Sequence, residues 1–229
     1  MLILNNFEKN ILFEDNHLLI VNKWPGLLSQ SDKTGDASLI DLAKAYIKKK
    51  YNKSGEVYLG IPHRLDRPVS GAIICCRTSK ALERMNALIK KREIEKKYHV
   101  LSSFQPMEME GKLISYLKKD SRNNTVVSSQ NEKAGYKKAI LSYKYLKRTS
   151  LSYHLLEVIL ETGRSHQIRV QLRDMGCPIL GDMKYFKQAP LEDKSIGLHA
   201  YSLKFVHPVR KTELFLTAPY PAKAWWKIN

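Results

Sequence analysis

The sequence lacks the features of a membrane-spanning or exported protein. It contains no apolar run near the roughly 18 residues that a helix needs to cross a bilayer. The N-terminal stretch Met1–Asn6 has no basic region followed by a long apolar run, so it does not resemble a secretory signal. We therefore expect no membrane segment.

Cysteine is scarce, with three residues in the chain: Cys75, Cys76 and Cys177. The count is odd, there is no CxxC pair, and the two neighbours lie in the apolar run Ala72–Cys76. This pattern predicts buried thiols and a cytoplasmic location. The chain also has no cluster of typical metal ligands and no dinucleotide-binding fingerprint, so we expect neither a metal nor a cofactor.

Positive charge is abundant. The 229 residues include 39 Lys and Arg against 22 Asp and Glu, a formal net charge of +17. Such an excess favours a polyanionic partner, because each phosphate that a cation neutralises releases counterions. Nucleic acid is the favoured partner, an anionic membrane surface is the rival, and simple solubility is the third explanation.

The apolar periodicity predicts strands and helices along most of the chain. Ser38 and Asp41 form a capping-box pattern, which predicts a helix that ends at Lys48–Lys50. We expect a second helix over 79–92, a short helix from about Ser165 to Gly176, and a mobile hairpin or loop over 118–138. Strands are expected at 11–13, 17–23, 72–76, 97–101, 139–146, 153–161, 200–206 and 213–217. Adjacent strands with only occasional helices between them predict an α+β fold with a mostly antiparallel sheet.

The segment His63–Gly71 lies between a polar loop and an apolar strand. Pro62, Pro68 and Gly71 favour a rigid turn, and the carboxylate of Asp66 is flanked by Arg64 and Arg67. Nearby positive charge favours the ionised carboxylate, which can act as a nucleophile or a base. Composition alone favours the simpler interpretation, in which Asp66 caps a turn and pairs with a neighbouring arginine.

A second polar segment runs from Gly163 to Arg173. On a helix His166, Arg169 and Arg173 share one face, while Ile168 and Leu172 share another. The basic face is either solvated or contacts a nucleic acid or a carboxylate. Farther upstream, Tyr98 stands beside Lys96 and Lys97, where its ring serves either as core or as a stacking platform for a base.

These segments together resemble the motifs of the RluA-type pseudouridine synthases. His63-Arg64-Leu65-Asp66 with Ser70-Gly71 resembles the first, Lys97-Tyr98 the second and Gly163–Arg169 the third. The likeness runs from about Ile11 to Pro219, and it includes Leu18–Leu28 and Gly176–Tyr185. It implies an RNA isomerase that acts on ribosomal or transfer RNA.

The resemblance assigns roles to individual residues. It implies that Asp66 is the catalytic aspartate, that Tyr98 lies against the flipped uracil and that Arg169 pairs with Asp66. Arg64 would fill the gap left by the extruded nucleotide. We further expect Arg67, His166 and Arg173 to contact RNA.

The resemblance also implies a mixed, largely antiparallel sheet in two halves with flanking helices and a catalytic cleft. We expect one catalytic domain over 1–229, without an appended S4-like domain, in a monomer. Three positions depart from the family pattern: Trp24, Val69 and Gln171 stand where Pro, Thr and His are common. Two rival functions remain, a catalytically silent RNA-binding or ribosome-assembly factor and a base-excising glycosylase.

Overall fold

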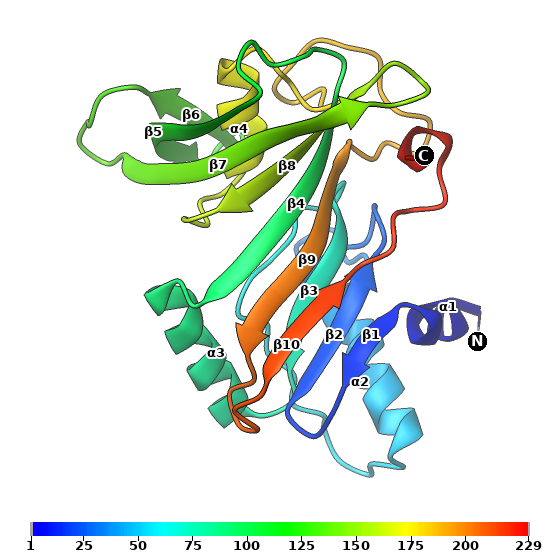
Figure 1. Ribbon diagram of the computed structural model, residues 1–229. Helices are drawn as coiled ribbons and strands as arrows, with labels where there is room; N and C mark the ends of the chain where they lie inside the picture. The colour runs from blue at the N-terminus through cyan, green and yellow to red at the C-terminus, as the bar shows by residue number, and fades with distance from the viewer. Residues whose placement is uncertain (1, 229) are drawn as a thin grey trace. The chain divides into compact units, whose positions relative to one another are not determined.

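The structure is a computed structural model that describes residues 2–228 (Figure 1). The described residues form ten strands, four α-helices and one short 3-10 helix. They make up two compact units, Met1–Glu95 with Ala200–Tyr220 and Lys96–His199 with Pro221–Asn229. The α+β class with a mostly antiparallel sheet is confirmed. Among the described residues, no helix is long and apolar enough to cross a membrane.

The sheet of the first unit is built from β1 (Ile11–Glu14), β2 (Leu18–Lys23), β3 (Ser70–Cys76), β9 (Leu198–Val206) and β10 (Glu213–Thr217). The strands lie in the order β1-β2-β3-β9, and β10 pairs with β9. β1 and β2 form an antiparallel hairpin, as do β9 and β10. Asp15 closes the first turn, because its Oδ1 accepts the N–H groups of His17 and Leu18 at 2.7 and 2.8 Å.

Three helices belong to the first unit: α1 (Leu2–Lys9), α2 (Leu39–Lys50) and α3 (Ser79–Lys91). The predicted capping box at Ser38 and Asp41 is present. At α3, the Thr78 hydroxyl accepts the Ala81 N–H at 3.1 Å. The apolar face of α3 packs on the sheet through Met85, which is fully buried with Leu18, Ile20 and Ile74. The first helix, α1, was not predicted from the sequence.

The second unit contains β4 (Ile94–Ser102), β5 (Glu110–Asp120), β6 (Thr125–Ser129), β7 (Lys137–Arg148), β8 (His154–Leu160) and the helix α4 (Gln167–Asp174). Its strand order is β4-β8-β7-β5-β6, with every one of these neighbours antiparallel. Val170 of α4 packs against a small core of Leu117, Val126 and Ala139. The short 3-10 helix Ala224–Trp226 lies near the end of the chain.

Of the two alternatives expected over 118–138, a mobile hairpin or a loop, the structure has a hairpin. β5 continues to Asp120, and β6 pairs with it in a regular register, for example Lys119 with Val126. The strand β5 itself was not predicted. Only one face of this hairpin contributes apolar side chains, chiefly Leu117 and Val126, so the local sequence is too polar to indicate a strand.

The three cysteines are buried free thiols, as predicted. Burial raises the pKa of Cys76 to about 12 and that of Cys177 to about 11. At neutral pH these groups are therefore protonated and act as small apolar side chains.

Gly71 is a site where the fold tolerates no side chain. It is the second residue of β3, with φ +115, and a Cβ would lie 2.3 Å from the Ala200 oxygen and 2.5 Å from the Ala200 nitrogen. We predict that Gly71→Ala lowers the free energy of unfolding by on the order of 3–5 kcal/mol, because backbone must move to admit a methyl group. Urea unfolding followed by circular dichroism measures it.

Gly55→Ala is the matched control, since no atom lies within 4 Å of a Cβ there. Equal stability of the two variants would contradict the close approach of β3 and β9.

Candidate active site

The His63–Gly71 loop is held by backbone bonds on both sides of Asp66. The Ser29 hydroxyl donates to the Leu65 oxygen at 2.6 Å, and the Leu65 N–H donates back to it at 3.1 Å. After Asp66 the chain turns, because the Val69 N–H donates to the Asp66 oxygen at 3.0 Å. Leu65 and Val69 are buried while Asp66 is half-buried, so the loop presents the carboxylate from a fixed backbone.

Lys23 connects this loop to the end of β2. Its side chain is fully buried, and Nζ donates to the backbone oxygens of Trp24 at 3.2 Å, Leu27 at 2.9 Å and Arg67 at 3.3 Å. Burial lowers the pKa of Lys23 to about 7, although the negative charge of Asp66 acts in the opposite direction. One ammonium thus joins the turn after β2 to the loop that carries Asp66. No sequence pattern had indicated a role for Lys23.

The two arginines beside Asp66 differ in their surroundings. Arg67 is tied down: its Nη2 lies 2.8 Å from Asp36 Oδ2 and its Nε donates to the Gly26 oxygen at 3.0 Å. Arg64 is exposed and makes no hydrogen bond or ion pair within residues 2–228. Arg64 is therefore available to a ligand, whereas Arg67 also braces the loop.

In the second unit, Tyr98 lies on β4 opposite Val158 of β8 and is 7% exposed. Lys96, two residues earlier on the strand, shares the face of Tyr98 because side chains alternate along a strand. Its Nζ lies 3.8 Å from the position of a Cβ on Gly163. Burial lowers the pKa of Lys96. β4 therefore brings the second sequence motif next to the third.

The turn before α4 is organised by Gln167. Its Oε1 accepts the Thr162 hydroxyl at 2.8 Å and the Arg164 N–H at 3.0 Å, and its Nε2 donates to the Ile140 oxygen at 3.0 Å. His166 precedes the helix in a left-handed conformation with φ 49. Its ring hydrogen-bonds to the hydroxyl of Tyr185.

Arg169 is buried, so the solvated basic face considered for α4 does not form. Arg169 is 5% exposed, and its Nε and Nη2 bond both oxygens of the buried Asp182 at 2.7 and 2.8 Å. Its guanidinium carbon lies 5.1 Å from the centre of the Tyr185 ring, over which Arg173 also lies at 5.6 Å. Asp182 and Tyr185 hold Arg169 in one orientation. Both belong to a segment that carried the family likeness, but no role had been predicted for them.

Comparisons with known proteins show to which family this chain belongs. The family model described as RNA pseudouridylate synthase matches residues 17–174. This chain belongs to that family. The earlier resemblance to its RluA-type members is confirmed, and the protein is an RNA pseudouridine synthase.

Individual relatives agree with this assignment. Ribosomal large subunit pseudouridine synthase C of Buchnera aphidicola is 33% identical over 93% of this chain and 67% of its own. An uncharacterized RNA pseudouridine synthase of Bacillus subtilis is 30% identical over 94% of this chain and 70% of its own. The structure of human RNA pseudouridylate synthase domain containing 4 has the same fold, with a TM-score of 0.79, 24% identity, and coverage of 96% of this chain and 92% of its own.

The buried ion pair of Arg169 and Asp182 in this pseudouridine synthase gives a stability prediction. Asp182→Ala removes two charge-assisted hydrogen bonds from the buried guanidinium of Arg169, so we expect the free energy of unfolding to fall by about 3–5 kcal/mol. Asp174→Ala, which removes an exposed carboxylate on the same helix, should cost less than about 1 kcal/mol. Urea denaturation measures the free energy of unfolding of both variants. Equal losses would contradict the prediction, because the buried pair would then contribute no more to stability than the exposed carboxylate does.

Lys23 gives a pH prediction. Its folded pKa lies below its unfolded value, so the unfolded chain holds more protons between pH 7 and about 10, and stability from this group rises with pH in that window. We compare the enzyme with its Lys23→Met variant. The free energy of unfolding of the wild type minus that of Lys23→Met should rise by on the order of 2 kcal/mol from pH 7 to pH 9. A difference that is flat with pH would contradict the lowered pKa.

Proposed function

We propose that this enzyme isomerises one or more uridines of ribosomal or transfer RNA, with Asp66 as its catalytic aspartate. The observation that carries the proposal is the rigid loop that holds Asp66 half-exposed between Arg64 and Arg67, above the buried ammonium of Lys23. The ribosomal target is supported by relatives named ribosomal large subunit pseudouridine synthase in Buchnera and Rickettsia.

The reaction requires a carboxylate that keeps its place while the base moves. The bond between uracil N1 and ribose C1′ breaks, the base turns, a bond forms between C5 and C1′, the C5 proton leaves and N1 gains a proton. An ionised Asp66 serves this reaction by attacking C1′, by adding to C6 of the base, or by removing a sugar proton. Positive charge from the two arginines, and from Lys23 in its protonated form, favours the anion that each route needs.

Arg64 has the properties required to replace an extruded nucleotide. A uridine in a stem must leave the stack before reaction, at a cost of a few kcal/mol. A long, exposed side chain with five N–H donors and no partner within residues 2–228 can enter the vacancy and bond the orphaned base. We assign this role to Arg64.

We assign Tyr98 to the face of the flipped uracil and Arg169 to the pairing with Asp66. The burial of Tyr98 and its position on the middle of a strand support a fixed ring. The grip of Asp182 on Nε and Nη2 of Arg169 supports a fixed guanidinium. His166 and Arg173, which contact Tyr185, are proposed to contact RNA with Arg67.

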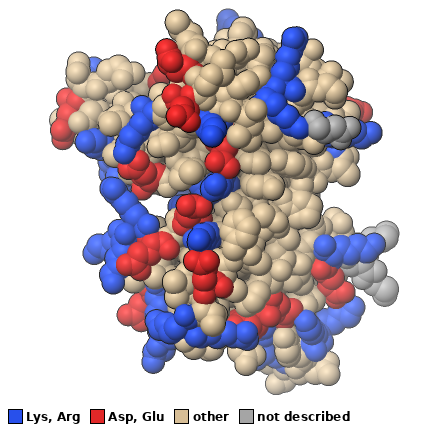
Figure 2. Space-filling view, viewed as in Figure 1, with Lys and Arg blue, Asp and Glu red and all other residues tan. Residues whose placement is uncertain are grey.

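The net positive charge of the chain also supports RNA binding. Lys and Arg side chains are spread over the visible face, with Asp and Glu among them (Figure 2). The net charge of +17 therefore supports a distributed electrostatic contact with phosphates instead of one dense patch on that face. A single catalytic domain, a monomeric state, a cytoplasmic location and independence from cofactors stay predictions.

Release of tritium from host RNA labelled at C5 of uridine tests the role of Asp66. We predict that wild-type enzyme releases tritium and that Asp66→Ala lowers the rate by at least about a hundredfold. Asp32→Ala, which removes an exposed carboxylate of the same unit, should keep the wild-type rate.

Unchanged release by Asp66→Ala would overturn the assignment of Asp66. Release of free uracil instead of tritium would indicate a glycosylase.

A further inference from the structure

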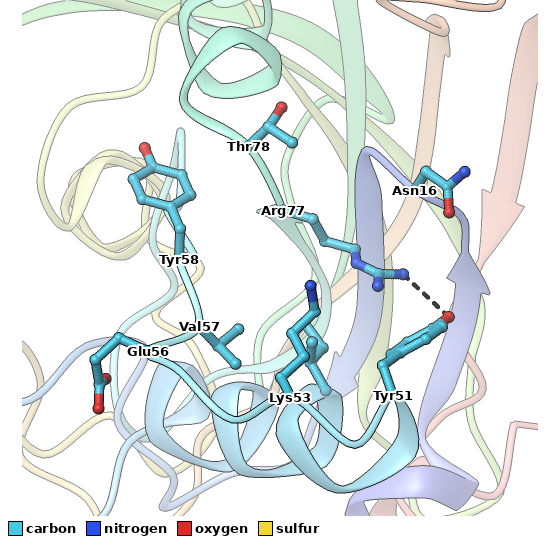
Figure 3. A pocket seen from close by; sticks show the side chains of 9 residues that line it. Asn16, Tyr51, Lys53, Glu56, Val57, Tyr58, Arg77 and Thr78 are labelled. Atoms are coloured by element: carbon cyan, nitrogen blue, oxygen red, sulfur yellow. Dashed lines mark hydrogen bonds between the residues drawn. The ribbon is translucent and has the colours of Figure 1, made fainter.

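A cavity of the first unit lies at the far end of β3 from Asp66. It has a volume of about 580 Å³, and we call it the Tyr51–Tyr58 pocket. Its walls come from the end of α2, from the connection 51–58, and from Arg77 and Thr78 after β3 (Figure 3). Ile47 and Val57 provide apolar surface. This volume falls within the range of small-ligand sites.

The pocket is separate from the Asp66 loop. Asp66 precedes β3 and Arg77 follows it, and at roughly 3.3 Å per residue this strand spans about 20 Å. No residue of the segment 62–71 lines the pocket. The uridine at Asp66 therefore cannot be the group that occupies it.

Two exposed side chains of the pocket have no partner in the described part of the chain. Tyr58 is 47% exposed and its hydroxyl makes no hydrogen bond there, and Lys53 forms no ion pair there. In Figure 3 the Lys53 side chain points into the space between Tyr58 and Arg77, while the carboxylate of Glu56 points away. An aromatic face and a cation thus border the same space.

The opposite wall is rigid. The Tyr51 hydroxyl donates to Glu14 Oε1 at 2.7 Å, and Arg77 Nη1 donates to the same atom at 3.2 Å and to the Asp15 oxygen at 2.6 Å. The guanidinium carbon of Arg77 lies 4.6 Å from the centre of the Tyr51 ring. Nε and Nη2 of Arg77 make no hydrogen bond within residues 2–228, so they remain available as donors.

We infer that the Tyr51–Tyr58 pocket binds an unpaired nucleotide of the RNA substrate, outside the uridine that reacts. The base stacks on Tyr58, and the phosphate is bound by Lys53 and by Arg77. Aromatic rings next to cations are the common means of holding single-stranded nucleotides without reading their sequence. The exposed lysines Lys48 and Lys49 at the end of α2 continue the cationic surface beside the pocket, whereas Lys50 pairs with Glu14 at 2.7 Å.

This inference rests on the proposed function for the identity of the RNA, and it adds a length requirement. At the 3.4 Å rise per nucleotide of a stacked strand, 20 Å corresponds to about six steps, and an extended single strand covers the same distance in fewer. An RNA that reaches both Asp66 and the pocket must extend at least that far from the target uridine. The pocket thus selects for substrates with an unpaired nucleotide at this distance.

The test is direct binding, because it does not depend on turnover. A fluorescein-labelled, unstructured 20-nucleotide RNA is titrated with full-length protein and followed by fluorescence anisotropy. We expect Tyr58→Ala to raise Kd on the order of tenfold. Lys53→Ala should lower the slope of log K against log salt by about one.

The controls are Phe215→Ala, which removes an aromatic side chain 59% exposed in the same unit, and Lys90→Ala, which removes an exposed lysine. Both should bind as the wild type does. If Tyr58→Ala also binds as the wild type does, or if Phe215→Ala weakens binding equally, the pocket is not an RNA site and the inference fails.

The Asp66→Ala variant separates this inference from the proposed function. It should bind the RNA normally and show the same loss when Tyr58→Ala is added. In the active enzyme, Tyr58→Ala should raise KM for tritium release from host RNA and leave kcat unchanged. Loss of kcat with an unchanged KM would place Tyr58 in the chemistry and contradict its role as a distant binding residue.

Discussion

The buried ammonium of Lys23 is the contact on which the Asp66 loop depends. Three backbone oxygens from two separate segments converge on its Nζ, and no other described side chain offers them a shared donor. Burial of a cation opposes folding, as its lowered pKa shows, so the loop is fixed at a cost in stability. The gain is a carboxylate that holds its position beside positive charge. Preorganisation of this kind suits the catalytic role that we propose for Asp66.

In the second unit a buried charged side chain again fixes a neighbouring group, but there the buried charge is negative. There a buried carboxylate, Asp182, grips Arg169 with two hydrogen bonds, and the ring of Tyr185 covers the guanidinium. In the first unit, the backbone bonded to Lys23 fixes the loop that carries the Asp66 carboxylate. In the second unit, the buried carboxylate of Asp182 fixes the guanidinium of Arg169. Lys96, partly desolvated beside Gly163, adds a further cation to this unit.

The sequence predicted the parts whose signals are local. Short patterns predict the hairpin of β1 and β2, the capping box at Ser38 and the strand β3 that follows Asp66. The family was visible in three motifs. The supporting residues were not predictable in this way. Asp182 becomes a partner of Arg169 only when the chain after α4 folds back, and the carbonyls that Lys23 binds lie up to 44 residues away. The strand β5 was not predicted, because its exposed face dominates its composition.

The most direct measurement is a map of pseudouridine in ribosomal and transfer RNA from host cells that lack this gene, complemented with the wild type or with Asp66→Asn. The account predicts that a defined set of uridines loses its modification in the deletion strain. The wild-type gene restores that set, and Asp66→Asn, expressed at the same level, does not. Full restoration by Asp66→Asn would contradict the role of Asp66.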